Sequence, residues 1–198
     1  MTAQVSDVVK YRGEEMSLVA FSAGEPFAPT EHGYRPVMAS TACYRGYVCE
    51  YEVAGDQLLL SKLNISHQGG NVPASARLRP PALNGVEAET SKSSHFGHWV
   101  FKQIDLPLSY TGGLIVARGF IRPLYVHMGF HPAWKYEEVH ELLFDSGTLV
   151  GEGNQSERMA ELRARMTAGQ ASRGELSSGE VATWIAESFS RDYTRRNS

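Results

Sequence analysis

The chain has 198 residues, of which 42% are hydrophobic and 21% charged, values that are ordinary for one globular domain with a substantial core. Its formal net charge of −3 argues against a broad nucleic-acid-binding face, and no apolar run approaches the roughly 20 residues needed to cross a bilayer. The N-terminal residues lack the basic start and apolar run of a signal peptide, and two cysteines, Cys43 and Cys49, do not make a disulfide framework. We therefore expect a cytoplasmic protein with no nucleic-acid or membrane partner.

Residues 1–150 are predicted to form a β-rich core domain, because short strand-like segments alternate with glycine and proline. The clearest strand is 47–53, "YVCEYEV", in which apolar side chains alternate with glutamates. The turn "AGDQ" and the apolar segment after it indicate a hairpin over 44–65. Because nothing helical separates the other strand candidates, they favour an antiparallel meander or sandwich-like sheet. These candidates are 16–22, 98–104, 114–121, 123–128, 136–144 and 148–150.

The segment 67–97 separates these strands and is rich in glycine, proline, serine and alanine, without a clean period. Loops of this length are usually functional or disordered. Two interpretations stay open, a lid or binding loop and a surface insertion.

Residues 151–198 are predicted to be a C-terminal helical segment packed on the core. A first helix is expected over 154–169, with Asn154 as its N-cap and Gly169 as its end. A second is expected over 177–193, where Ser177 and Glu180 fit a capping box. The apolar stripes of the two helices are Met159, Leu162 and Met166, and Val181, Trp184, Ile185 and Phe189.

The predicted fold class is therefore α+β, a mainly antiparallel sheet with two C-terminal amphipathic helices. Packing of both stripes on the sheet is the default expectation. Docking of the stripes on a second copy or on a partner is the alternative, and docking on a second copy would give a homodimer.

The stretch 125–144, "YVHMGFHPAWKYEEVHELLF", contains three of the seven histidines. His127 and His131 have a spacing that would suit zinc on a helix, but Gly129 and Pro132 argue against a helix there. On a strand, positions four apart lie roughly 13 Å from each other, too far for joint ligation. We therefore predict neither a metal site nor a cofactor.

An acid–base site is the second interpretation of this stretch. Glu138 and His140 would share one face of a strand, where a carboxylate and an imidazole can tune each other's pKa. The simpler interpretation is the polar face of an edge strand. The candidate catalytic residues are His127, His131, Glu138 and His140. The chain has no G-x-S-x-G elbow, P-loop or dinucleotide-binding motif.

Candidate binding residues are arginines and aromatic residues. Arg45, Arg118 and Arg122 lie among aromatic residues, where they can bind a carboxylate or phosphate or pair with strand glutamates. Aromatic side chains beside turn residues are expected to be partly exposed, as in protein interfaces. These are Tyr34, Tyr44, Tyr110, Tyr125, Phe130 and Trp134. The residues predicted to bind a partner are Arg45, Arg118, Arg122, Phe130 and Trp134.

Two segments, 40–60 and 125–150, together resemble a pattern in uncharacterised bacterial proteins. In this pattern an R-G-Y strand leads into a D-x-L-x-L return, and an H-M-G segment later precedes a Y-E strand and a glycine turn. The resemblance covers about half the chain. It implies a β-rich fold and no established activity, so it assigns no functional residues.

The leading functional hypothesis is a non-enzymatic cytoplasmic protein-binding domain, specifically an immunity-type inhibitor that occludes the active site of a bacterial toxin. Its mild acidity suits an inhibitor of basic nucleases. One alternative is a hydrolase with its site at 95–98, 127–131 and 138–141. The other is a self-associating structural subunit that uses the C-terminal helices.

Overall fold

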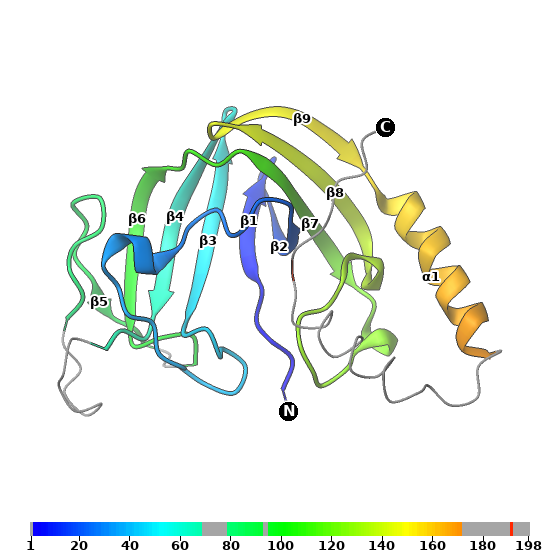
Figure 1. The fold of residues 1–198 in the computed structure, drawn as a ribbon, viewed down its shortest axis with the longest axis horizontal. Coiled ribbons are helices and arrows are strands. Elements are labelled where there is room, and N and C mark those ends of the chain that lie inside the picture. The colour runs from blue at the N-terminus through cyan, green and yellow to red at the C-terminus, as the bar shows by residue number, and fades with distance from the viewer. Residues whose placement is uncertain (1, 69–78, 93–94, 172–190, 192–198) are drawn as a thin grey trace.

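One nine-stranded sheet and one α-helix make up the computed structural model, which describes residues 2–68, 79–92, 95–171 and 191 (Figure 1). The strands are β1 (Asp7–Tyr11), β2 (Glu14–Phe21), β3 (Tyr47–Ala54), β4 (Gln57–Ile65), β5 (Glu89–Thr90), β6 (Trp99–Pro107), β7 (Gly112–Phe120), β8 (Tyr136–Asp145) and β9 (Thr148–Asn154). The helix is α1 (Ser156–Ala171), and short 3₁₀ turns are η1 (Pro29–His32), η2 (Arg122–Leu124) and η3 (Ala133–Lys135). No helix among the described residues is long and apolar enough to span a membrane.

The sheet closes on itself. Its strand order is β3-β1-β2-β7-β8-β9-β4-β6-β5, and β3 also pairs with β4. The closing contact between β9 and β4 is a single pair, Thr148 with Gln57. Every pairing is antiparallel except that of β1 with β3, so the sheet is mixed but mostly antiparallel, as the sequence predicted.

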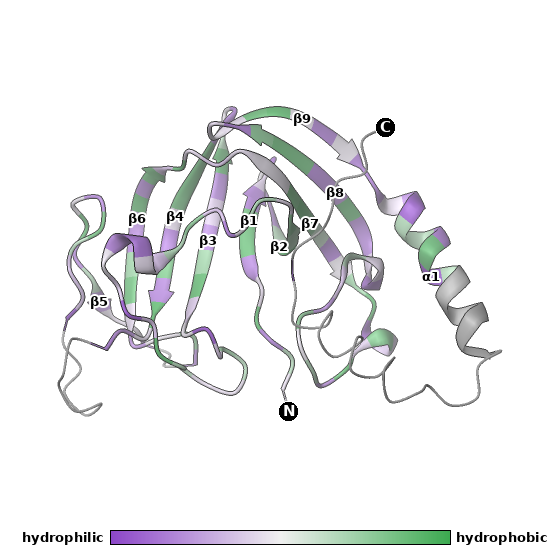
Figure 2. Cartoon of the chain, in the orientation of Figure 1, coloured by the Kyte–Doolittle hydropathy of each residue, from purple (hydrophilic) through white to green (hydrophobic). Residues whose placement is uncertain are grey.

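The core lies on the inner face of this closed sheet. Alternate residues of most strands point inward, as strand geometry requires, and are buried, whereas β5 and β9 have no buried residue. Figure 2 shows the resulting alternation of apolar and polar residues along the strands. Typical inward residues are Val9, Leu18, Tyr51, Val116 and Leu142. A smaller cluster lies on the outer face of the sheet, where Met159 of α1 packs against Val139 and its neighbours.

The hairpin over 44–65 and five other expected strands are confirmed, with shifts of a few residues at their ends. The strand expected at 123–128 is wrong, because this segment begins as the turn η2 and continues without regular structure. Pro123 has no N–H to donate to a ladder, which explains why the segment does not extend the sheet. β1 and the two-residue β5 were not predicted from the sequence.

One C-terminal helix is present in the described part of the chain, instead of the two that were expected. α1 continues through Gly169 to Ala171, and Asn154 is the last residue of β9. The Asn154 side chain nevertheless accepts a hydrogen bond from the Ser156 N–H (2.9 Å), in the manner of a cap. The second expected helix, 177–193, lies outside the described residues except for Arg191, which is not helical.

The long segment 67–97 is described only in part, since 69–78 and 93–94 are outside the described residues. Its described middle packs on the sheet. Leu83 and Ala88 are buried in the core, and β5 pairs with β6. The Asn84 side chain donates to the carbonyl oxygen of Ile104 (2.7 Å).

Candidate functional site

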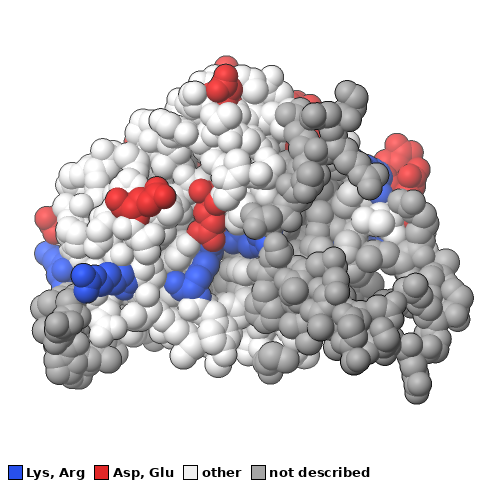
Figure 3. Space-filling model, in the orientation of Figure 1, with Lys and Arg blue, Asp and Glu red and all other residues white. Residues whose placement is uncertain are grey.

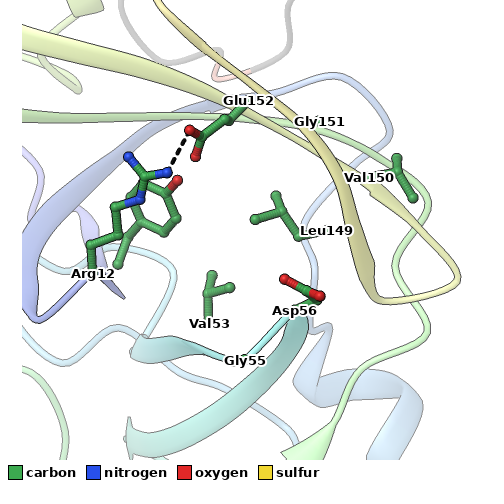
Figure 4. Close-up of a pocket in the computed structure, with 9 residues that line it drawn as sticks. Arg12, Val53, Gly55, Asp56, Leu149, Val150, Gly151 and Glu152 are labelled. Atoms are coloured by element: carbon green, nitrogen blue, oxygen red, sulfur yellow. Dashed lines mark hydrogen bonds and ion pairs between the residues drawn. The ribbon is translucent and has the colours of Figure 1, made fainter.

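A pocket of about 400 Å³ opens where β9 leaves β4 (Figure 4). β9 carries a bulge at Val150, which has no partner on β8. One edge of β9 pairs with β8. Beyond Thr148, the opposite edge of β9 pairs with no strand among the described residues. The pocket lies between this free edge and the turns that follow β1 and β3. Its lining consists of Tyr11, Arg12, Val53, Gly55, Asp56, Leu149, Val150, Gly151 and Glu152.

The rim of the pocket is charged. Arg12 and Glu152 meet across it, with 2.6 Å between Nη2 and Oε1 (Figure 4). The Arg12 guanidinium also lies 5.1 Å from the centroid of the Tyr11 ring. Asp56 is exposed and forms no ion pair with another described residue. The Tyr11 hydroxyl is buried and has no hydrogen-bond partner.

A polar cluster on β2, β7 and β8 adjoins this pocket through Tyr11, whose ring centroid lies 6.3 Å from that of His140. Glu138 Oε1 lies 2.9 Å from His140 Nε2, and Glu138 Oε2 accepts from Arg118 Nε at 2.6 Å. Arg118 in turn pairs with Glu14 at 2.8 Å. The hydrogen bonds from His140 and Arg118 lower the pKa of Glu138.

The contact between Glu138 and His140 was predicted from the alternation of β8. Its chemistry is limited by Arg118, because a carboxylate with a lowered pKa stays ionised and is a weak base. Glu138 can orient the His140 imidazole, which is the role of a positioning carboxylate.

The other two candidate histidines lie elsewhere, around Tyr125. The ring centroid of His127 lies 4.8 Å from that of Tyr125, and the ring centroid of His131 lies 5.1 Å from it. His131 is buried against Phe120, and neither of its ring nitrogens has a hydrogen-bond partner. Burial, together with the nearby Lys135 ammonium, lowers the pKa of His131 to about 4.

The third segment of the proposed hydrolase site, 95–98, adjoins a different loop. Ser40 Oγ donates a hydrogen bond to the His95 carbonyl oxygen (2.9 Å). Within the described residues, no group of three or more His, Cys, Asp or Glu side chains is placed to hold a metal ion.

The five predicted binding residues do not form one surface. Arg118 pairs with glutamates, and Arg122 is exposed at the start of η2. Trp134 is half-buried, with the Lys135 ammonium 5.2 Å from its ring centroid. Arg45 and Phe130, in contrast, both contribute to a buried charge cluster.

The buried charge cluster is centred on Asp7, which is 1% exposed on the same face of β1 as Val9. Arg45 binds one oxygen of Asp7, and both terminal nitrogens of Arg191 lie 3.0 Å from the other. Arg45 also pairs with Glu25 (3.1 Å). Two carboxylates thus face two guanidinium groups, so the cluster is electrically neutral.

Little in the sequence indicated this cluster. Asp7 would have been a signal only if β1 had been predicted, because an acidic residue at an inward position of a strand needs a partner. Arg191 could not have been found, because the sequence placed it in the helix expected over 177–193, whereas the residue is not helical in the structure.

The loop 35–46 lies at the end of the sheet where β3 begins (Figure 1). It carries an exposed apolar patch. Tyr44 is 60% exposed and Met38 57% exposed, and Val37 and Phe96 are also exposed. Phe96 adjoins the loop through its carbonyl oxygen, which lies 4.0 Å from Cys43 Sγ. Of the aromatic residues expected at the surface, Tyr44 and Tyr125 are exposed, whereas Tyr34 and Tyr110 are buried.

Comparisons with protein-family models, with curated proteins and with solved structures find no match. The resemblance to uncharacterised bacterial proteins therefore stays a prediction.

Proposed function

We propose that this chain is a non-enzymatic cytoplasmic protein-binding domain that docks a partner on the apolar patch of Val37, Met38, Tyr44 and Phe96. The observation that carries the proposal is the exposure of these four large apolar side chains on adjoining segments. Aromatic residues and methionine are enriched at the centres of protein interfaces. Contiguous exposed apolar side chains are uncommon on surfaces that bind nothing.

The loop that carries the patch is held in place by backbone hydrogen bonds. The Val37 N–H donates to the Ser66 carbonyl oxygen (2.9 Å), and the Ser66 N–H donates to that of Gly46 (2.8 Å). The Ala39 N–H donates to the Cys43 carbonyl oxygen (3.2 Å). A loop fixed before binding loses little conformational entropy when a partner docks, which favours affinity.

Within this class, the specific proposal is an immunity-type inhibitor that occludes the active site of a toxin. The net charge of −3 favours association with a basic partner. In Figure 3, the charged side chains on the face shown form small groups of both signs, so the electrostatic bias is mild. The apolar patch therefore supplies the affinity and charge supplies the bias toward basic partners.

The test is affinity purification from the native cytosol with three forms of the full chain. These are the natural chain, the patch variant Met38→Glu/Tyr44→Glu, and the control Ala82→Glu/Thr90→Glu, which adds the same charge at exposed positions. We expect one stoichiometric partner that binds the natural chain and the control. Binding of the purified partner to the patch variant should be weaker by about 100-fold or more, the effect of two interface hot spots. Equal binding of the patch variant would overturn the proposal.

The immunity proposal adds a second readout. If the partner is a toxin domain, cells that lack this gene should die on exposure to that toxin, and the natural chain should restore survival. If cells that lack the gene survive exposure to the toxin, the chain is not an immunity protein but a protein-binding domain of another kind.

A hydrolase is the second candidate function, and the 2.9 Å contact between Glu138 and His140 beside the pocket favours it. The test is turnover of chromogenic esters by the natural chain, His140→Gln and Glu138→Gln, with Glu87→Gln as an exposed control. Loss of about 100-fold in rate in both site variants, the usual contribution of an acid–base pair, would support it. If the natural chain does not turn over these esters, or if all four proteins do so at the same rate, a hydrolase that uses Glu138 and His140 is excluded for these substrates.

A further inference from the structure

The pocket beside β9 is separate from the apolar patch. Loop 35–46 precedes β3, and the pocket residues Val53, Gly55 and Asp56 lie at the other end of β3. β3 has 8 residues, so about 23 Å separates its first residue from its last. A partner on the patch would therefore need an extended contact surface to reach the pocket.

The lining of the pocket favours a cationic guest. Asp56 and Glu152 bring two carboxylates against the single guanidinium of Arg12, which leaves an excess of one negative charge. Asp56 is the carboxylate without an ion-pair partner among the described residues. An added cation would complete the charge balance of the rim.

The position of Arg12 indicates which cation fits. Its guanidinium lies 5.1 Å from the Tyr11 ring centroid and 2.6 Å from Glu152 Oε1, so the pocket already offers a guanidinium both a π face and a carboxylate. The side chain of Arg12 is 67% exposed, and exposed ion pairs of this kind contribute little to stability. A competing guanidinium can therefore displace Arg12 at little cost.

The buried Tyr11 hydroxyl is the second, independent feature of the pocket. Tyr11 lines the pocket, and its hydroxyl has no hydrogen-bond partner. An unsatisfied buried polar group is costly, so a guest that displaces Arg12 and reaches this hydroxyl with a hydrogen bond gains affinity. The five donors of a guanidinium suit both this hydroxyl and a carboxylate.

We propose that the pocket between β9 and the turns after β1 and β3 binds an arginine side chain of the partner protein, with Asp56 as its counter-ion and the Tyr11 ring as its stacking surface. This inference rests on the proposed protein-binding function, since the arginine comes from the partner. A guanidinium inserted in a pocket is a common anchor of protein interfaces.

The test uses small probes and does not require the partner. The full ¹⁵N-labelled chain is titrated with N-acetyl-arginine amide and followed by NMR, with the citrulline, lysine and glutamate analogues titrated in parallel. We expect saturable shifts of the Asp56, Leu149 and Gly151 amides with the arginine probe. Citrulline has nearly the same shape without the charge and should bind at least about fivefold more weakly, because a charge-assisted hydrogen bond is lost.

Two variants assign the effect to the pocket. Asp56→Asn removes the counter-ion at an exposed turn position and should weaken the arginine probe by about threefold or more, whereas Asp105→Asn, an exposed carboxylate on β6, should leave it unchanged. No saturable shift at the pocket, or equal binding of citrulline, lysine or glutamate, would overturn the arginine site. Neither result would affect the patch, whose variants are tested separately against the partner.

Discussion

Arg191 places both terminal nitrogens of its guanidinium 3.0 Å from one carboxylate oxygen of Asp7, although 184 residues separate the two in the chain. Its Cζ also lies 5.1 Å from the Phe21 ring centroid and 4.9 Å from that of Phe130. The Phe21 N–H donates to the Arg191 carbonyl oxygen (2.8 Å). One residue near the C-terminus is thus fixed by charge, ring contacts and backbone against strands near the N-terminus.

Arg191→Met should destabilise the fold, because it removes one of the two cations that compensate the buried Asp7. Loss of one partner of a buried pair costs about 3–5 kcal/mol, and Arg45, which remains, places the expected loss near the lower end, at about 3 kcal/mol. Urea unfolding of the natural chain and the variant measures it. Arg158→Met, at an exposed position of α1, is the matched control. Equal midpoints for Arg191→Met and the control would show that the contact contributes nothing to stability.

The same cluster predicts how stability depends on pH. Burial alone would raise the pKa of Asp7, but Arg45 and Arg191 more than offset it and lower the pKa below 3.8. A carboxyl whose pKa is lowered by folding stabilises the fold above its unfolded pKa, and that contribution is lost as the pH falls below it. Stability should therefore decline below about pH 4. Asp7→Asn should remove this part of the decline, and an unchanged acid-unfolding profile in that variant would contradict the assignment.

Sequence patterns predicted the parts of this fold that depend on local alternation. The strand 47–53 shows it best, because inward positions such as Cys49 and Tyr51 are buried and Glu50 between them is less so. The same reasoning placed Glu138 and His140 on one face of β8, where they are in contact. A pattern that repeats every two residues depends only on the pleat of a single strand, so it can be recognised without knowing how the strands pair.

Features that depend on distant segments could not be predicted. The closure of the sheet rests on one pair, Gln57 with Thr148, for which no sequence signal exists. The free edge of β9 follows from that closure, and so does the pocket. Arg45 was expected at a binding surface, yet it lies in the buried cluster because Asp7 and Glu25 converge there from other segments.

Gly46 is predicted to fix the geometry of the apolar patch. Its φ of 79° is in the left-handed region, and a Cβ at this residue would lie 2.1 Å from the Val37 carbonyl oxygen. Gly46→Ala should therefore displace Val37, weaken partner binding and destabilise the fold. Gly24→Ala is the matched control, because Gly24 has a similar φ of 77° and open space around its Cβ.

The two variants separate backbone strain from steric conflict. Gly24→Ala should cost about 1 kcal/mol, the penalty of the left-handed conformation alone. Gly46→Ala should cost clearly more in urea unfolding and should be the only one of the two that reduces binding. Similar losses in both variants would mean that the backbone near Val37 adjusts freely.

His131 gives the last prediction, which concerns a buried imidazole without hydrogen-bond partners. Its pKa of about 4 lies below the ordinary value of 6.5, because burial disfavours the charged form. The unfolded chain therefore binds a proton on His131 between about pH 6.5 and pH 4 that the folded chain does not bind. The stability of the fold decreases as the pH drops through this window.

His131→Leu removes both this titration and two unsatisfied nitrogens among aromatic rings, so the variant should be more stable than the natural chain. The gain in stability should be larger at pH 5 than at pH 7.5. Urea unfolding at the two pH values measures the difference, with His95→Leu at an exposed position as the control. If His131→Leu is less stable than the natural chain by the same amount at both pH values, the prediction is wrong, and the buried imidazole stabilises the fold through a hydrogen bond.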